Sequence, residues 1–364
     1  MSRIRFQIIP PIFRPEEKIF ISGNVEALGA WDSAKALALE YQPAFHSAEI
    51  AAPEGTHLEY KITCGSWETE AVDAYGCVAS NFRHEASGNE TIRHVVADWK
   101  DRFKGQLTSA RVHSQILNGD RELLVWLPPG YTTKQKTRFP VIYLNDGDTV
   151  FNPQTSVFSG IDWAADEWVI KLRSEGVLPE AIVVAICHPK GFSPEGETLR
   201  NGDLSPQRRG AAYAEFLATE LVPYIDTHYR TLANAGARTL GGANLGALNS
   251  LFTALHYPEI FSRIVCLSTS FEDVTQSLPA HSLQLQAMES AASLPAGVRV
   301  YFDYGTVGLD ECYEPYHGDL GGILSEKGWK DGREFVIRKI QDGSHDELSW
   351  RARFGEALRF LAKK

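Results

Sequence analysis

The chain has 364 residues, of which 43% are hydrophobic and 23% charged, and its formal net charge is −10. That length suits two domains with buried cores, and an acidic chain without a run of basic residues is a poor partner for nucleic acid. No apolar stretch approaches the ~20 residues that cross a bilayer, and the first residues lack the features of a signal peptide. We therefore expect neither a nucleic-acid partner nor a membrane partner.

Residues 1–102 have the pattern of an all-β domain. Alternating apolar and polar residues, separated by turn-rich pieces such as APEGT and EASGNE, are typical of half-buried strands. In chain order, strands are predicted at RIRFQII (3–9), KIFISG (18–23), HLEYKITC (57–64) and TIRHVVADW (91–99). No convincing amphipathic helix precedes residue 100, so we expect a small immunoglobulin-like β-sandwich here.

From residue 108 to 364, strands and helices alternate. Apolar strands are predicted at 123–129, 140–146, 181–188, 239–242, 263–269, 298–305 and 334–341. Helices are predicted around 162–176, 211–229, after 244, near 318–328 and over 349–364. Alternation of apolar strands with helices predicts a mostly parallel sheet covered by helices on both faces, an α/β fold.

A Gly-rich corner lies inside RTLGGANLGALNS, residues 238–250. An apolar stretch enters it and a helical pattern leaves it, which is the layout of the G-x-S-x-G nucleophile elbow of serine hydrolases. Here the corner reads Gly242-Ala243-Asn244-Leu245-Gly246, so an asparagine stands where the serine would be.

The N-terminal stretches FISGNVEALGAWDSAKALAL and LEYKITCGSWETE resemble the starch-binding domain of carbohydrate-binding module family 20. The resemblance implies a glucan-binding face built from Trp31, Lys61 and Trp67, with indole rings stacked on sugars and a lysine donating to hydroxyls. The alternative is that these tryptophans simply belong to the core of a structural domain, one that shields or shapes the neighbouring active site.

The landmarks VWLPPGY, FPVIYLNDGDTVFN, LVPYIDTHYR, GGANLGALNSLFTALHYPEIFSRIVCLS and DGSHDELSW resemble the putative-esterase family of α/β-hydrolases, which includes esterase D, enterochelin esterases and feruloyl esterases. The resemblance implies an α/β-hydrolase fold over residues 108–364. It implies that Asn244 occupies the nucleophile position. The main-chain N–H of Leu245 would be one oxyanion-hole donor, and the loop around Asp146 or Gly147 would supply the second.

The family pattern also implies a base and an acid. His345, shortly before the last helix, would be the base, and the acid would follow the strand VRVYFDYG. Asp310 is the first choice for the acid, Glu311 the reserve, and Asp303 the less favoured candidate. Asp162, Trp163 and Arg200 fall in landmark segments and would either line a substrate cleft or hold their own loops by hydrogen bonds.

An asparagine changes the chemistry of the corner, because acyl transfer needs an oxygen or sulfur that a histidine can deprotonate. We expect a degenerate esterase that binds a carbohydrate or acyl-ester ligand with little turnover. The alternative is an active ester hydrolase with an unrecognised nucleophile or an activated water. Ser268, and less so Ser250, are the candidate replacements, and a deliberate Ser→Asn change is a third interpretation.

Cysteine and histidine spacing predicts no metal or cofactor. The five cysteines are odd in number and without C-x-x-C spacing, and His188, His256 and His317 lack ligand spacing. Scattered cysteines fit reduced thiols, so we expect a cytoplasmic protein. Its expected partners are a carbohydrate or acyl-ester small molecule and, through the first domain, α-glucan.

Overall fold

The computed structural model describes residues 1–363, except positions 13, 15, 74, 75, 79, 152–155, 157–159, 195, 197, 272–282 and 292. The chain divides into two compact units, the first comprising Met1–Gln106 with Pro129–Gln135 and the second comprising Leu107–Pro128 with Lys136–Lys364. Within the described residues, no helix is long and apolar enough to span a membrane.

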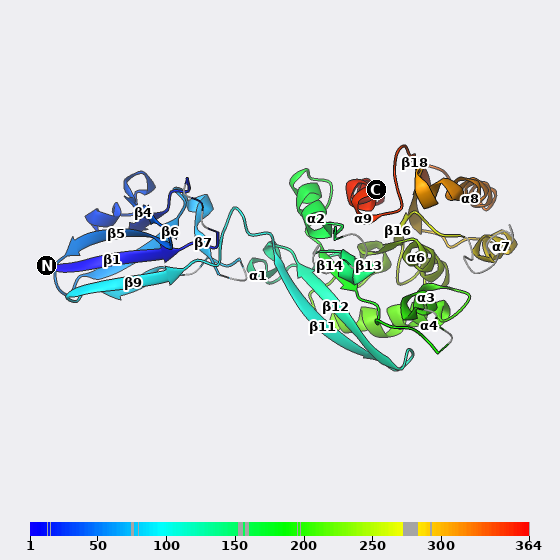
Figure 1. The fold of residues 1–364 in the computed structure, drawn as a ribbon, viewed down its shortest axis with the longest axis horizontal. Coiled ribbons are helices and arrows are strands. Elements are labelled where there is room, and N and C mark those ends of the chain that lie inside the picture. The colour runs from blue at the N-terminus through cyan, green and yellow to red at the C-terminus, as the bar shows by residue number, and fades with distance from the viewer. Residues whose placement is uncertain are drawn as a thin grey trace. The chain divides into compact units, whose positions relative to one another are not determined.

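The first unit is built from two four-stranded sheets (Figure 1). One has the order β4-β5-β1-β9 and the other the order β3-β2-β6-β8, while β7 and β10 form a two-stranded pair. The strands are β1 (Ser2–Ile9), β2 (Phe20–Gly23), β3 (Leu37–Ala38), β4 (Glu40–Gln42), β5 (Phe45–Ala52), β6 (His57–Thr63), β7 (Ala71–Val72), β8 (Phe82–Glu85), β9 (Asn89–Val95) and β10 (Asp98–Trp99).

Strand β1 alternates buried and outward-facing side chains, so that one of its faces contributes to the core of a β-sandwich. Ile4, Phe6 and Ile8 are fully buried while the residues between them face outward, because successive side chains of a strand point to opposite faces. They share one core with Leu58, Tyr60 and other residues of β6, which belongs to the other sheet. The predicted all-β domain is therefore present, and its described helical pieces are short turns except for α1 (Gly130–Thr133).

The second unit has an eight-stranded sheet of order β11-β12-β14-β13-β15-β16-β17-β18. Strand β12 is antiparallel to β14, and the strands from β14 to β18 are parallel to their neighbours. The strands are β11 (Gln106–Ser114), β12 (Gly119–Leu127), β13 (Val141–Asn145), β14 (Ile182–Ile186), β15 (Arg238–Ala243), β16 (Arg263–Leu267), β17 (Arg299–Gly305) and β18 (Phe335–Ile340).

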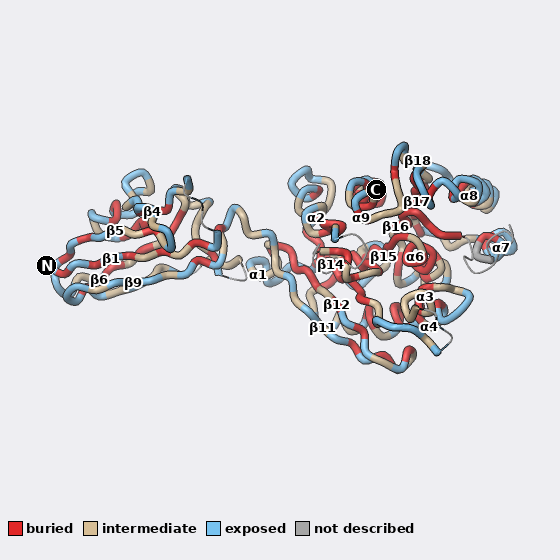
Figure 2. The backbone as a smooth tube through the Cα atoms, viewed as in Figure 1, coloured by how far each residue is buried: buried red, intermediate tan, exposed pale blue. Residues whose placement is uncertain are grey.

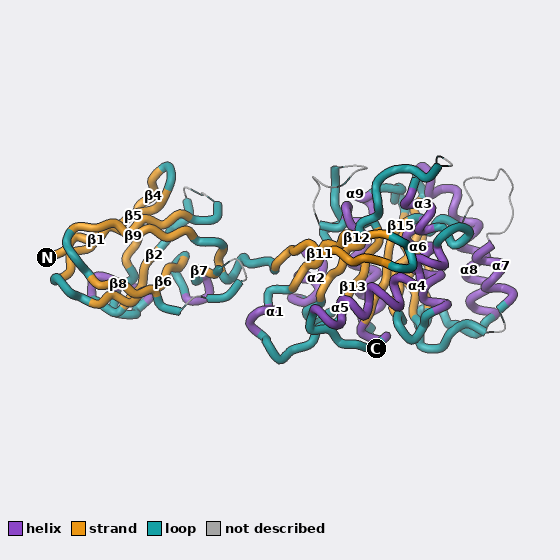
Figure 3. The backbone as a smooth tube through the Cα atoms, turned by 90° about the horizontal axis from the view of Figure 1, so that it is seen from below, coloured by secondary structure: helices purple, strands orange, loops and turns teal. Residues whose placement is uncertain are grey.

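Helices of the second unit cover both faces of this sheet (Figures 1 and 3). Helices α2 and α9 pack together, and α9 contacts β16 and β17, whereas α6 contacts β15 and β16 and is joined by α3 and α4. The helices are α2 (Ala165–Ser174), α3 (Leu199–Leu204), α4 (Gly210–Phe216), a π-helical turn η5 (Leu217–Leu221), α5 (Val222–His228), α6 (Leu245–His256), α7 (Leu283–Ser290), α8 (Glu314–Glu326) and α9 (Glu347–Ala362).

The central strands are buried from end to end (Figure 2). Every residue of β13, β14 and β15 is buried, as expected for parallel strands covered on both faces. The predicted α/β-hydrolase architecture is confirmed, and the predicted strands and helices fall on observed ones. Strand β11 and helices α3 and α7 were not predicted, since their segments are short or carry a weak apolar period.

Candidate active site

A sharp turn joins β15 to α6 at Asn244. Its φ of 56° and ψ of −121° lie in a region that residues with a side chain rarely adopt. Glycines make the corner possible: a Cβ on Gly242 would lie 2.6 Å from the carbonyl carbon of Gly246. The helix therefore starts directly above the end of the strand, and residue 244 is held at the mouth of the sheet as in a nucleophile elbow.

The side-chain amide of Asn244 is fully engaged. Its Oδ1 accepts a 2.7 Å hydrogen bond from the main-chain N–H of Leu245, the predicted oxyanion-hole donor. Its Nδ2 lies 3.0 Å from His345 Nε2 and donates to the Tyr313 hydroxyl over 3.3 Å. Because Leu245 N–H needs an acceptor, the amide oxygen faces it and the amide nitrogen faces the histidine. The amide thus covers both the oxyanion donor and the base.

His345 and Asp310 lie in contact as the base and the acid that accompany the nucleophile position. His345 Nδ1 lies 2.6 Å from Asp310 Oδ1. Since His345 Nε2 faces an N–H donor and must accept, its proton is on Nδ1 and is donated to Asp310. This is the tautomer in which a triad histidine acts as a base toward its nucleophile. The sequence-predicted residues Asn244, His345 and Asp310 are therefore brought together in hydrogen-bonding order.

Asp310 is buried, and its carboxylate is surrounded by donors. Burial would raise the pKa of this carboxyl, but hydrogen bonds from His345, from Ser268 Oγ at 2.6 Å and from Gly305 N at 2.7 Å hold the pKa below its ordinary value. Asp310 therefore stays ionised and orients the imidazole. The reserve acid Glu311 is exposed and accepts instead from the main-chain N–H of Gly308.

The less favoured acid, Asp303, lies behind Asp310 within β17. Its carboxylate accepts from Ser268 N at 3.0 Å and lies 3.2 Å from Arg353 Nε. Burial raises the pKa of Asp303 to about 7 although Arg353 opposes this. Asp303 therefore supports the network beneath the site, and the contact to His345 belongs to Asp310.

Neither candidate replacement serine is placed as a nucleophile. Ser250 is buried in α6, where its hydroxyl donates to Gly246 O and accepts from Asn145 Nδ2. Ser268 is fully buried, donates to Asp310, and accepts from Trp350 Nε1 over 2.9 Å. Both hydroxyls are committed to structural hydrogen bonds.

The loop after β13 contributes Asp146 to the pocket. Asp146 has a left-handed backbone, with φ of 59°, and its carboxylate pairs with the Arg200 guanidinium, with Nη2 to Oδ2 at 2.7 Å. Burial raises the pKa of Asp146, but Arg200 outweighs this and leaves it below its ordinary value. Gly147 lies against β14, since a Cβ there would meet the main-chain nitrogen of Cys187 at 2.8 Å.

A pocket of about 330 Å³ opens above Asn244 and His345. Of the residues predicted for substrate contact, Trp163 and Arg200 line it. Asp162 is not among the lining residues: its carboxylate accepts a hydrogen bond from Arg351 Nη1 at 2.5 Å and so holds its own loop to α9, which is the second of the two roles expected for it. Sequence reasoning missed the remaining lining residues, which are Thr149, Asn201, Ala243, Ser270, Glu347 and Trp350.

Two polar groups of the residues that line this pocket lack a hydrogen-bond partner within the described part of the chain. Trp163 Nε1 is buried without a hydrogen-bond partner in the described part of the chain. The carboxylate of Glu347, only 4% exposed, likewise makes no hydrogen bond with the described residues. Glu347 follows His345 by two positions, so the GSHDELSW motif could have indicated it. Tyr313 carried no comparable sequence signal.

The described histidines outside the site are dispersed over several elements. Among the described residues, no group of three or more His, Cys, Asp or Glu could hold a metal ion. His188 lies 3.7 Å from Asp146, His317 is buried in α8, and His256 stacks on Phe252 at the protein surface.

In the first unit, Trp31 and Trp67 lie side by side. Their ring centroids are 6.3 Å apart, and Trp31 is 36% exposed. Lys61, on β6, lies 3.5 Å from Glu70. The structure therefore places the two indoles together, while the lysine is engaged by a carboxylate.

This fold, with an elbow, a histidine and an acid in hydrogen-bonding order, defines an α/β-hydrolase of the esterase type. Residues 114–361 match the family described as "Putative esterase", so the chain belongs to that family, and residues 1–94 match the starch binding domain family. Two Bacillus subtilis (strain 168) proteins, both described as uncharacterized, are similar: YjcH is 31% identical over 45% of this chain and YbbA 25% over 52%. The alignments span 62% of YjcH and 69% of YbbA.

Solved structures share the fold. A ferulic acid esterase aligns with a TM-score of 0.56 at 18% identity, over 71% of this chain and 98% of its own. An enterobactin esterase from Shigella flexneri aligns with a TM-score of 0.54 at 14% identity, over 96% of this chain and 89% of its own. An enterobactin esterase from Salmonella typhimurium aligns with a TM-score of 0.55 at 15% identity, over 96% and 89%.

Proposed function

We propose that the second unit is a degenerate esterase that binds a carbohydrate or acyl-ester ligand with little serine-hydrolase turnover. The observation that carries this is the Asn244 amide, which bonds both the Leu245 N–H and His345 Nε2. A carboxamide cannot be converted into an attacking anion by a histidine. Removal of a triad serine costs about a million-fold in kcat, near 8 kcal/mol in the barrier, which neighbouring groups do not recover.

The pocket supports a hydroxyl-bearing or acyl ligand. Trp163 and Trp350 line it with indole rings, Trp163 Nε1 has no hydrogen-bond partner among the described residues, and Glu347 brings a carboxylate. A sugar ring has apolar faces and hydroxyls that match this combination. The names of the structural relatives, ferulic acid esterase and enterobactin esterase, support an acyl-ester ligand by analogy.

Hydrolysis of p-nitrophenyl acetate by the native chain tests the proposal. We expect a rate close to that of buffer and no covalent labelling by a fluorophosphonate probe, with His345→Ala indistinguishable from the native chain. Turnover well above buffer that disappears in His345→Ala would instead establish the alternative, an active hydrolase with an activated water or an unrecognised nucleophile. A labelled serine identified by mass spectrometry would do the same.

The adjacent indoles of Trp31 and Trp67 favour a second function for the first unit, binding of α-glucan. Affinity electrophoresis of the full chain in amylose gels tests it. We expect retardation that is lost in Trp31→Ala and in Trp67→Ala. Tyr41→Ala, which removes another exposed aromatic ring of the same unit, is the matched control and should remain retarded. Equal mobility with and without amylose would reject glucan binding.

We also propose a cytoplasmic location. It is supported by the five cysteines, all of which are free thiols. Fractionation of the native host with antibody detection tests this, and recovery in a secreted fraction would contradict it.

A further inference from the structure

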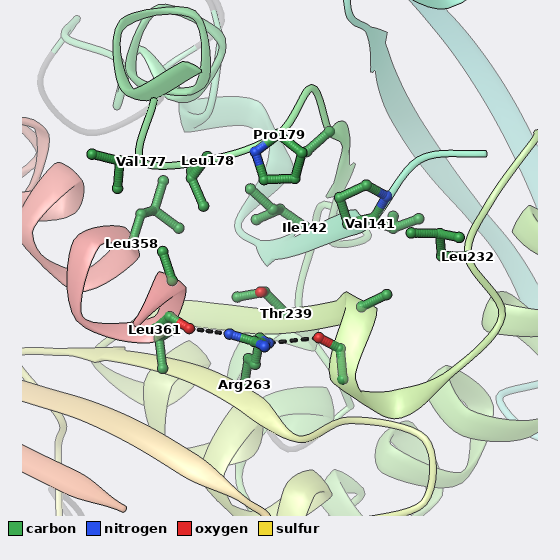
Figure 4. A pocket seen from close by; sticks show the side chains of 15 residues that line it. Val141, Ile142, Val177, Leu178, Pro179, Leu232, Thr239, Arg263, Leu358 and Leu361 are labelled. Carbon is green, nitrogen blue, oxygen red and sulfur yellow. Dashed lines mark hydrogen bonds between the residues drawn. The ribbon is translucent and has the colours of Figure 1, made fainter. Parts of the chain in front are cut away.

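A second cavity, distinct from the active-site pocket, lies at the end of the sheet where the central parallel strands begin, and its lining is drawn in Figure 4. It measures about 240 Å³. Its walls are mostly apolar and come from the starts of β13 and β15, from the loop before β14 and from the last turns of α9. The apolar lining includes Val141, Leu178, Pro179, Leu232, Leu358 and Leu361.

Strand direction separates the two sites. Val141 opens β13 at this cavity, while Asn145 ends the same strand next to Asp146 of the active-site pocket. Likewise β16 runs from Arg263 at the cavity to Leu267, one residue before Ser268. At about 3.3 Å per residue, a five-residue strand spans roughly 15 Å, so a ligand here does not reach His345.

Arg263 brings a positive charge to this apolar cavity. Its Nε donates to Gly236 O over 2.6 Å and its Nη1 donates to Leu361 O, as the dashed lines in Figure 4 mark. These two carbonyls hold the guanidinium at the cavity. Its third nitrogen, Nη2, makes no hydrogen bond with the described residues.

No carboxylate balances this charge within the described chain. Arg263 has no acidic group within ion-pair distance there, whereas Arg353, Arg238 and Arg121 each pair with an aspartate. The neighbouring charge is a second cation, Arg299, and burial followed by Arg299 lowers the pKa of Arg263. The electrostatic environment of the cavity therefore favours an anion and disfavours a cation.

We propose that this cavity binds a small amphipathic monocarboxylate, an aromatic or short aliphatic acid, with its apolar body among the leucines and its carboxylate on Arg263. Charge complementarity selects the acid, since a neutral apolar ligand leaves the guanidinium unbalanced. The size fits, because a 150 Å³ apolar cavity holds benzene and this one has room for a ring with a short acidic chain. The proposal is independent of the function of the pocket at Asn244.

Calorimetric titration of the native chain with 3-phenylpropanoate tests the proposal. We expect saturable binding of one acid per chain with a dissociation constant below about 1 mM. The neutral isostere 3-phenyl-1-propanol should bind at least roughly tenfold more weakly. This comparison needs no substitution, so it stays decisive if a variant fails to fold.

Two variants locate the site. Arg263→Gln removes the charge and Ala237→Leu fills the cavity, and each should weaken acid binding by at least about tenfold. Arg338→Gln is the matched control: it removes an exposed cation of β18 that pairs with Glu356 and does not line the cavity, and binding should stay within about threefold. Circular dichroism and thermal unfolding establish which variants are folded.

Three results would overturn the proposal. The first is no saturable binding of the acid up to about 10 mM. The second is equal affinity for the acid and the alcohol, which would make the cavity a general apolar void. The third is acid binding that survives in folded Arg263→Gln and Ala237→Leu, which would place the acid elsewhere.

Discussion

Asn244 Nδ2 lies 3.0 Å from His345 Nε2, so an amide donor occupies the position from which a serine hydroxyl would give up its proton. The histidine is oriented as it would be in a working triad, because Asp310 Oδ1 accepts a 2.6 Å hydrogen bond from its Nδ1–H. The site therefore keeps a base, an acid and an oxyanion donor, while the group between them has no proton that the base can usefully remove.

Asn244→Ser should restore ester hydrolysis. A hydroxyl at the elbow would face His345 Nε2 and free the Leu245 N–H, which Asn244 Oδ1 now engages. Because a triad serine is worth about a million-fold in kcat, we expect hydrolysis of p-nitrophenyl acetate to rise by at least about 100-fold over the native chain. Initial rates measure this, and a fluorophosphonate probe should label residue 244.

The double variant Asn244→Ser, His345→Ala is the control for this gain. It should return to the native rate if the new serine depends on the histidine. A folded Asn244→Ser protein with no gain would show that the pocket has been remodelled beyond the loss of its nucleophile.

Backbone strain at the elbow predicts that a glycine at residue 244 gives a more stable protein than an alanine, the reverse of the usual order inside a helix. At φ of 56° and ψ of −121°, glycine is relaxed and alanine is strained. We expect Asn244→Gly to exceed Asn244→Ala by about 1–2 kcal/mol in the free energy of unfolding measured with urea. Asn201, inside α3, is the matched position, and there alanine should be the more stable by about 1 kcal/mol. The same order at both positions would refute the strain at Asn244.

The sequence predicted those parts of the site that lie at the ends of regular elements. Asn244 lies between a strand and a helix whose patterns are strong, and His345 lies just before the last amphipathic helix. Asp310 could be chosen over Glu311 only by resemblance, since the two are adjacent and neither periodicity nor turn chemistry separates them. In the folded chain, Asp310 is buried and its carboxylate accepts hydrogen bonds from four donors, one of which is His345. These contacts identify Asp310 as the acid.

Other parts of the site depend on long-range pairing and were not predictable. Asp162 and Arg351 are 189 positions apart, so their ion pair depends on how α2 and α9 pack. Tyr313 reaches Asn244 from a short turn without periodicity. Helix α3 is too short to be recognised by its pattern, yet it carries Arg200 to Asp146.

Ser268→Ala should destabilise the protein, and like the native chain it should show no labelling by the fluorophosphonate. The Ser268 hydroxyl is buried, donates to Asp310 and accepts from Trp350 Nε1, so its removal leaves buried polar groups unpaired. We expect a loss of about 1–3 kcal/mol in the free energy of unfolding, measured with urea. Ser325→Ala, at an exposed serine of α8, should change it by less than about 0.5 kcal/mol. Loss of a covalent adduct in Ser268→Ala would show instead that Ser268 reacts.

His317 should make the fold sensitive to mild acid. Burial lowers its pKa from 6.5 to about 4, while its Nδ1 donates to Tyr313 O over 2.9 Å, so the folded state holds the neutral form. The unfolded state binds the proton first. Stability from this group is therefore complete above pH about 6.5 and is lost as the pH falls toward 4, by up to roughly 3 kcal/mol.

His317→Gln removes this titration while keeping a side-chain N–H donor. Urea unfolding of the native chain and of this variant between pH 7 and pH about 4.5 should show that the native chain loses more stability, by about 1–3 kcal/mol. His256→Gln, at an exposed histidine of α6, is the matched substitution and should keep the native pH dependence. Equal acid sensitivity of the native chain and His317→Gln would mean that His317 takes up its proton as readily in the folded state as in the unfolded state, because only a group whose pKa differs between the two states links folding to pH.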